Sequence, residues 1–269
     1  MGKVPALSIV CLGVSVLIDF GFPMILFIFF RKKFGAKVVP MAFGVAGFIV
    51  FALILESLLH TIVLRRDENG VIALLGSPFL YTLYGTMAAG VFEETARFLS
   101  FLFLKKKYAG VGTGLAYGVG HGGAEAILVA GLPMISNLAL SVMINFNIGG
   151  ITEMLGDLPQ AADGISQLIS TPSYLFLISG VERVGAIAIQ ISLSVLVWYA
   201  VCLEGKRWLY PAAVLLHALV DVPAALMQTG VLTSIVLVEG FVYAAAAVLI
   251  VLAAAAYKKW EPRPAPIQS

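Results

Sequence analysis

Long apolar runs make up most of this sequence, and short loops that carry many of its charged residues separate them. Eight runs can be distinguished, at residues 6–30, 38–64, 74–104, 110–131, 132–150, 172–203, 209–229 and 231–257. About 20 apolar residues are enough for a helix to cross the hydrocarbon core of a bilayer. Only 12% of the residues are charged, whereas soluble domains average about 25%. The sequence therefore predicts an all-α, polytopic transmembrane helical bundle and excludes an ordinary soluble globule.

No polar stretch of the chain is long enough to form a second folded domain. We predict one membrane-embedded helical domain at residues 1–257 and a short, basic, proline-rich tail at 258–269. The net charge is only +2, and the basic residues stand in separate loops rather than in one patch. Nucleic acid is therefore not an expected partner, since its binding needs a concentrated basic surface.

Lysine and arginine gather in loops that the positive-inside rule places in the cytoplasm. The charged residues of the loop at 151–171 are all acidic. The main basic clusters lie at 31–37, at 105–107, at 205–207 and in the tail. These clusters share one side if the segment 132–150 enters the membrane without crossing it, or if a further crossing lies near 151–171. The segment 132–150 is interrupted by Pro133, Asn137, Asn145 and Asn147. We therefore predict an outside N-terminus, an inside C-terminus and about 7–8 spans. Either seven full spans accompany one irregular segment, or there are eight plain spans.

Ionisable side chains stand in the middle of several runs, where each costs about 2.5–3.5 kcal/mol unless it is paired or hydrated. The third run contains Glu93, Glu94 and Arg97. At about 100° per residue the two glutamates point in different directions, and Arg97 projects between them. Pairing with Arg97 engages one glutamate and leaves the other able to hold a proton or to act on water.

Two further runs carry histidine together with a carboxylate. The fourth run surrounds His121 with glycines, which let helices or a peptide backbone approach it closely, and places Glu125 one turn later. The seventh run contains His217 and Asp221, whose i,i+4 spacing puts both side chains on one helix face. Each of these two histidine patterns, taken by itself, is more often structural than functional. Together they predict that the motif residues converge on an intramembrane cavity.

The sixth run adds Glu182 and Arg183. Arg183 shares a stripe of polar residues with Ser179, Gln190 and Ser194, so this helix is predicted to face the polar centre. We therefore expect Glu125, Glu182 and Arg183 to support the site.

Glu56 and His60 form another i,i+4 pair, near the end of the second run. We interpret this pair as structural, because side chains at that depth reach the interface at little cost. Asp19 is a single acid in the first run, and the sequence assigns it no role.

Buried carboxylates and histidines in one cavity are compatible with three activities. Glu93 and His121 can activate a shared water for attack on a peptide carbonyl, with His217 donating a hydrogen bond to the oxyanion. Two histidines and a glutamate can also hold a catalytic zinc ion, although the chain contains no HExxH motif. The same groups can relay protons or bind an ion in a transporter. The residue chemistry alone leaves all three open.

The motifs Glu93-Glu94-x-x-Arg97, Tyr117-x-x-x-His121 and His217-x-x-x-Asp221, in this order, resemble those of the glutamic intramembrane proteases. That superfamily includes the type II CAAX endopeptidases, their bacterial CPBP relatives and the PrsW proteases. The glycine-rich segment around His121 and the Glu182-Arg183 pair look most similar to its YhfC-type branch. The similarity covers residues from about 90 to 225.

The resemblance implies a membrane-embedded, glutamic-type endopeptidase that uses no metal and no other cofactor. By position, Glu93 would be the base, ordered by Glu94 and Arg97, His121 would share the water, and His217 with Asp221 would stabilise the oxyanion. Asp221 stands where the prenyl endopeptidases have asparagine, so the resemblance also allows it to orient His217 instead. The implied substrate is a membrane protein or a membrane-associated peptide. The implied location is the lipid bilayer of a prokaryotic plasma membrane, as an integral, multi-pass protein.

Overall fold

The structure is a computed structural model that describes residues 2–66, 68, 71–150 and 159–261. The described residues form helices and connecting turns, and no β-strand occurs among them, which confirms the all-α class. Much of the acidic loop, at 151–158, and residues 262–269 of the predicted tail lie outside the described residues.

Six helices in the described part of the chain are long and apolar enough to cross a membrane. The elements that form them are α1 (Ala6–Phe34), α2 (Val38–Gly47) with η1 (Phe48–Glu56) and α3 (Ser57–Val63), α5 (Val111–Glu125) with η3 (Ala126–Gly131) and α6 (Leu132–Phe146), α9 (Ser173–Cys202), α10 (Leu209–Gln228) and α11 (Ile235–Trp260). Shorter elements are η2 (Ala73–Gly76), η4 (Ile148–Gly150) and α8 (Pro159–Ser170). The protein is therefore an integral, multi-pass membrane protein.

Helix α4 (Pro78–Leu104) is also long enough to span, at 27 residues, but it carries three charged residues in its middle. It begins sharply because Ser77 caps it and Pro78 occupies its first turn, where a missing N–H breaks no intrahelical bond. Counting α4, the basic clusters at 31–33, 105–107, 206–207 and 258–259 follow every second long helix. This alternation agrees with an outside N-terminus and an inside C-terminus.

The prediction of a separate irregular segment at 132–150 is wrong. Residues Val111–Phe146 form one continuous helix of 36 residues, so Pro133 does not interrupt it. Pro133 follows directly on the π-helical turn Ala126–Gly131, where the hydrogen bonds already depart from the regular α-helical ladder. A residue without an N–H is tolerated there because no i→i−4 bond is lost.

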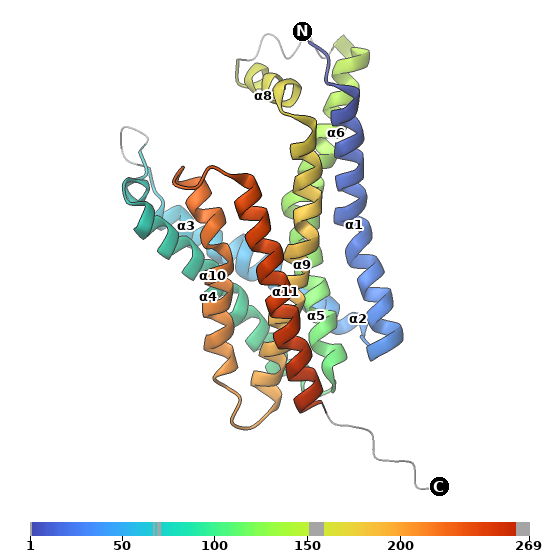
Figure 1. The fold of residues 1–269 in the computed structure, drawn as a ribbon, viewed down its shortest axis with the longest axis vertical. Helices are drawn as coiled ribbons and strands as arrows, with labels where there is room; N and C mark the ends of the chain where they lie inside the picture. Colours follow the sequence, from blue (N-terminus) through green and yellow to red (C-terminus); the bar gives the residue numbers. More distant parts are fainter. Residues whose placement is uncertain (1, 67, 69–70, 151–158, 262–269) are drawn as a thin grey trace. The chain divides into compact units, whose positions relative to one another are not determined.

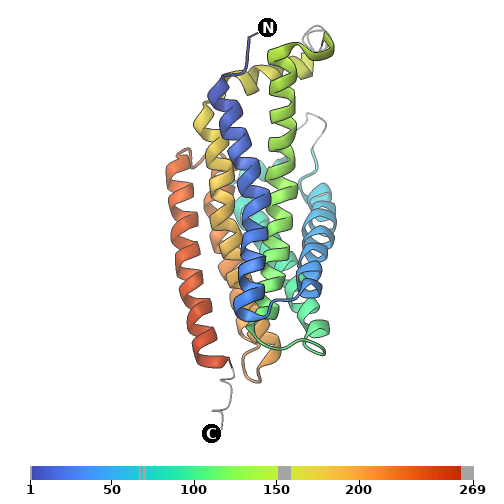
Figure 2. The same cartoon turned by 90° about the vertical axis from the view of Figure 1, so that its right-hand side faces the viewer.

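The chain divides into two compact units, which are described separately. The first comprises Met1–Met24 and Glu125–Val184, and the second comprises Ile25–Ala124 and Gly185–Ser269. In the first unit the start of α1 runs beside α6 (Figure 2), and Asn145 ties the two together. Its Oδ1 accepts from the backbone N–H of Val4 at 2.8 Å, and its Nδ2 donates to the carbonyl of Val4 at 2.9 Å. Ser15 donates to the carbonyl of Phe176 at 2.6 Å, which joins α1 to α9.

In the second unit α10 packs along α4, and α11 packs against α10 (Figure 1). Glycines permit the closest backbone approaches. A Cβ built on Gly90 of α4 would stand 2.7 Å from the carbonyl oxygen of Val214 in α10. A Cβ on Gly120 of α5 would overlap the carbonyl oxygen of Met41 in α2. The predicted role of the glycines around His121, to let neighbouring backbones approach, is therefore realised in the packing of α5.

Replacing Gly120 by alanine is expected to destabilise the protein by about 1–3 kcal/mol, because the neighbour that must move is backbone rather than a flexible side chain. Thermal unfolding in detergent measures the effect. Gly240 of α11 provides the matched control, since nothing lies within 4 Å of a Cβ built there. The same change at Gly240 should leave the stability equal or slightly higher, because alanine favours helix. Equal behaviour of the two variants would contradict the packing described here.

Candidate active site

Arg97 pairs with two buried glutamates of its own helix, α4. Its Nη1 donates to Oε1 of Glu94, and its Nη2 lies 3.6 Å from Oε2 of Glu93. Arg97 and Glu94 are completely buried, and Glu93 is 7% exposed. Because a buried charge without a partner is strongly destabilising, this pairing allows two carboxylates to stand in the middle of a long helix.

Two side chains of α9 hold the guanidinium in place. Nε of Arg97 donates to Oγ of Ser194 at 3.1 Å, and Nη2 donates to Oε1 of Gln190. The amide of Gln190 then donates from Nε2 to Oε2 of Glu93 at 3.1 Å. Gln190 therefore connects the arginine to the second glutamate and fixes the direction in which the Glu93 carboxylate points. Of the polar stripe predicted for this helix, Gln190 and Ser194 contact the cluster.

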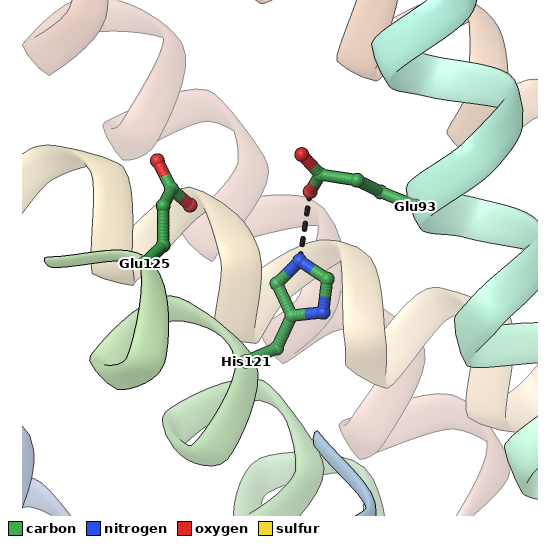
Figure 3. Close-up of side chains that lie close together, drawn as sticks. All are labelled: Glu93, His121 and Glu125. Carbon is green, nitrogen blue, oxygen red and sulfur yellow. Dashed lines mark hydrogen bonds and ion pairs between the residues drawn. The ribbon is translucent and has the colours of Figure 1, made fainter. Parts of the chain in front are cut away.

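His121 of α5 meets the same carboxylate oxygen. Its Nε2 lies 2.8 Å from Oε2 of Glu93, at hydrogen-bond distance (Figure 3). The ring is fully buried, stacks on Tyr117 at 6.0 Å between centroids and makes a T-shaped contact with Phe48 at 5.3 Å. Its Nδ1 has no hydrogen-bond partner among the described residues. The ring therefore donates from Nε2 to the Glu93 carboxylate, since a proton on Nδ1 would have no acceptor.

His217 of α10 approaches both glutamates. Its Nδ1 lies 2.8 Å from Oε1 of Glu94, and its Nε2 lies 3.7 Å from Oε2 of Glu93. The carboxylate of Asp221 lies on the Nε2 side as well, with Oδ2 at 3.6 Å, which is longer than a hydrogen bond. Glu94 therefore orients the imidazole, and Asp221 is placed beside the nitrogen that faces Glu93.

Six residues singled out in the sequence thus gather in the second unit: Glu93, Glu94, Arg97, His121, His217 and Asp221. They come from α4, α5 and α10, and α9 supplies two further hydrogen-bonding side chains. One oxygen, Oε2 of Glu93, lies at hydrogen-bond distance from His121 and accepts from the amide of Gln190. The guanidinium of Arg97 lies 3.6 Å from the same oxygen. This convergence makes Glu93 the chemically central group of the cluster.

The other three predicted residues, Glu125, Glu182 and Arg183, form an ion-pair cluster within the first unit. Arg183 donates from Nη1 to Oε1 of Glu125 at 3.0 Å and from Nε to Oε2 of Glu182 at 3.0 Å. Asp19 of the same unit is fully buried, and neither of its carboxylate oxygens has a hydrogen-bond partner among the described residues. Arg183 thus pairs within its own unit, and the supporting role of these three residues stays a prediction.

The zinc alternative can be tested against the donor geometry. Two ligands of a tetrahedral zinc at about 2.0–2.2 Å stand about 3.3 Å apart or more. His121 Nε2 and Glu93 Oε2 are only 2.8 Å apart, which is a direct hydrogen bond. A zinc-bound histidine also almost always donates its second ring N–H, whereas Nδ1 of His121 has no acceptor among the described residues. The residue types suit zinc, but the direct hydrogen bond between His121 and Glu93 has to open before both can bind one ion.

Sequence reasoning missed two members of this site. Phe48 lies in a run of apolar residues that ends only at Glu56, and nothing in its immediate neighbours marks it as the ring that packs on His121. Gln190 belonged to a recognised polar stripe, but its bond to Glu93 depends on how α9 packs against α4 and α5. The polar stripe was the sequence signal that could have identified Gln190 as a site residue. The sequence contains no such signal for Phe48.

Comparisons with known proteins identify the family to which this chain belongs. Residues 14–242 match the family described as YhfC intramembrane metalloprotease, and this range contains all of the residues discussed above for the cluster. The uncharacterized membrane protein YhfC of Bacillus subtilis (strain 168) is 41% identical over 237 residues, which are 86% of this chain and 90% of the relative. No solved structure matches the chain.

Proposed function

Because the chain belongs to the YhfC intramembrane metalloprotease family, we propose that it hydrolyses peptide bonds of membrane substrates with a water activated by Glu93 and His121. The observation that carries this proposal is the hydrogen bond of 2.8 Å between His121 Nε2 and Glu93 Oε2, with His217 Nε2 3.7 Å from the same oxygen. Relation to the wider group of glutamic intramembrane proteases is part of the proposal. It is supported by the order of the three motifs along the chain.

Glu93 is the general base. A water beside its carboxylate loses a proton to Glu93 while its oxygen attacks the carbonyl carbon of the scissile peptide bond. His121 and Gln190 hydrogen-bond to Oε2 and thereby hold the carboxylate in one orientation. The proton that Glu93 gains is then passed to the leaving amine, so that the base is restored when the C–N bond breaks.

His217 stabilises the oxyanion. Its Nδ1 is at hydrogen-bond distance from Glu94, which Arg97 holds in turn, so the direction of the imidazole is fixed before substrate arrives. A ring that carries both protons donates one to Glu94 and directs the other, on Nε2, toward the developing negative charge. Asp221 lies beside Nε2 and favours this charged form of the ring electrostatically.

Metal content separates this mechanism from the one that the family's description suggests. Purified protein is expected to contain zinc far below one ion per chain and to keep its peptidase activity after dialysis against EDTA, because Glu93 and His121 hydrogen-bond directly to each other. Elemental analysis together with the peptidase assay measures both, and a zinc protease treated in parallel shows that the chelator works. Stoichiometric zinc that is lost together with activity would refute the metal-free mechanism.

The substrate can be sought by comparative membrane proteomics. Cells that express the active protein are compared with cells that express Glu93→Gln, and peptides that end within membrane segments are scored. Glu204→Gln is the matched control, because Glu204 is exposed in the loop between α9 and α10. Fragments that are present with the active protein and with Glu204→Gln, but absent with Glu93→Gln, would support the proposal. Identical fragments in all three strains would count against it.

A further inference from the structure

A cavity of about 380 Å³ lies in the second unit, between α3 with the end of η1, α4 and α10. Its size falls within the about 300–1,000 Å³ that is typical of small-ligand sites. The polar residues of its lining are Glu56, His60, Tyr81, Tyr84, Thr86, Asp221 and Gln228. The catalytic mechanism described above uses only one of them, Asp221.

The cavity adjoins the catalytic cluster. Asp221 lines the cavity, and its Oδ2 lies 3.6 Å from Nε2 of His217. Ala89, another lining residue, precedes Glu93 by four positions, which is about one turn of α4. A group bound in this cavity therefore stands about one helical turn from the residues that activate water.

Glu56 is held in the cavity by a short chain of hydrogen-bonding groups. Its Oε1 lies 3.3 Å from Nε2 of His60, and Nδ1 of His60 lies 2.7 Å from the hydroxyl of Tyr84. A neutral ring that accepts from Tyr84 carries its proton on Nε2, so it directs this N–H toward the Glu56 carboxylate. Glu56 is only 8% exposed, so protein encloses its carboxylate at the wall of the cavity.

The charged groups of the lining are of one sign. Two carboxylates, Glu56 and Asp221, line the cavity, and the lining includes no lysine or arginine. Carboxylates in a hollow with low-dielectric walls concentrate their field there and favour a cation. At the opposite end, the hydroxyl of Tyr81 donates to Oε1 of Gln228 at 2.9 Å, so that end presents neutral polar groups.

We propose that this cavity binds a positively charged group of the substrate peptide beside the scissile bond, either a lysine or arginine side chain or a free amino terminus. This inference rests on the proposed function insofar as it takes the ligand to be a peptide. Glu56 determines the specificity, because its carboxylate contacts the cation and takes no part in activating water. Asp221 adds a second negative charge on the side of the cavity that meets His217.

Binding is tested separately from cleavage, with the full-length Glu93→Gln protein in detergent micelles. The probes are fluorescent transmembrane peptides of about 20 residues, long enough to span a bilayer. One is N-acetylated and carries a single central lysine. The second carries norleucine at that position, and the third carries norleucine with a free amino terminus. The lysine or the free-amine peptide is expected to bind about tenfold more tightly than the acetylated norleucine peptide.

The arms of this experiment identify the source of the charge and the residue that recognises it. Preference for the lysine peptide indicates a side chain, and preference for the free amine indicates a terminus. Adding Glu56→Gln to the binding protein should remove the preference, whereas adding Glu204→Gln should keep it, because Glu204 lies outside the cavity. Equal affinities for all three peptides on the parent protein would overturn the inference without any need for a folded Glu56 variant.

Cleavage of the same peptides by the active protein distinguishes the two proposals. Cleavage with equal kcat/KM for all three peptides would overturn the cation site and leave the peptidase function intact. Preferential binding without cleavage of any peptide would leave the cation site intact and count against the peptidase function. A third result would support both the cation site and the peptidase function. The active protein would cleave the charged peptide preferentially, and Glu56→Gln would abolish this preference while it still cleaves the norleucine peptide at the original rate.

Discussion

Replacing Glu93 by glutamine is expected to slow peptide cleavage by about 100- to 10,000-fold, because an amide cannot take the proton of the attacking water. The side chain keeps its size and its ability to accept from His121 Nε2, which lies 2.8 Å from Oε2. The thermal stability of the variant should therefore stay close to that of the parent protein. Cleavage assays with the purified variant, combined with thermal unfolding, measure both quantities on one sample.

Two comparisons make this result specific. Glu204→Gln, at an exposed position, should retain full activity. Glu93→Asp keeps the carboxylate but shortens the side chain, so activity between those of Glu93→Gln and the parent protein is expected. If Glu93→Gln cut peptides at an undiminished rate, Glu93 would not be the base and the mechanism would fail. If it lost activity only because it unfolded, the glutamine would have failed as an isosteric replacement.

Replacing Arg97 by methionine is expected to lower the free energy of unfolding by about 3–5 kcal/mol, the usual cost of removing one partner of a buried ion pair. Arg97 is fully buried and donates to Glu94, Gln190 and Ser194. Without it, Glu94 would keep His217 alone as a partner for its charge. Equilibrium unfolding in mixed detergent and denaturant gives the change in free energy.

A double variant separates stability from catalysis. Adding Glu94→Met to Arg97→Met removes the uncompensated carboxylate, so a large part of the lost stability should return, as it does when buried pairs are replaced by apolar residues. Peptide cleavage should stay impaired, because Nδ1 of His217 then loses the Glu94 carboxylate that orients it. A double variant as active as the parent protein would show that Glu94 does not position His217.

The predictions that succeeded rest on periodicity and on the cost of polar groups in hydrocarbon. The apolar runs identified a multi-pass helical protein, because a chain in a bilayer must satisfy its backbone hydrogen bonds within helices. The i,i+3 and i,i+4 spacings put Arg97 between Glu93 and Glu94 and placed Asp221 on the face of His217. Such spacings fix which side chains share a helix face, because the geometry of one helix is nearly constant.

The prediction that failed concerns a segment whose behaviour depends on its surroundings. Pro133 was expected to interrupt the segment 132–150, but a π-helical turn just before it lets the helix continue. A local rule was applied there to a position where the neighbouring structure changes the outcome.

Local chemistry and the helical repeat were enough to predict that the chain spans the membrane as helices and which side chains are too polar to face lipid. The partners of these side chains follow only from how the helices pack. Glu94 rather than Asp221 holds Nδ1 of His217, Gln190 joins Arg97 to Glu93, and Arg183 pairs within its own unit. Partners between helices depend on their rotation and packing, which glycine contacts such as Gly90 against Val214 set and which no single helix encodes.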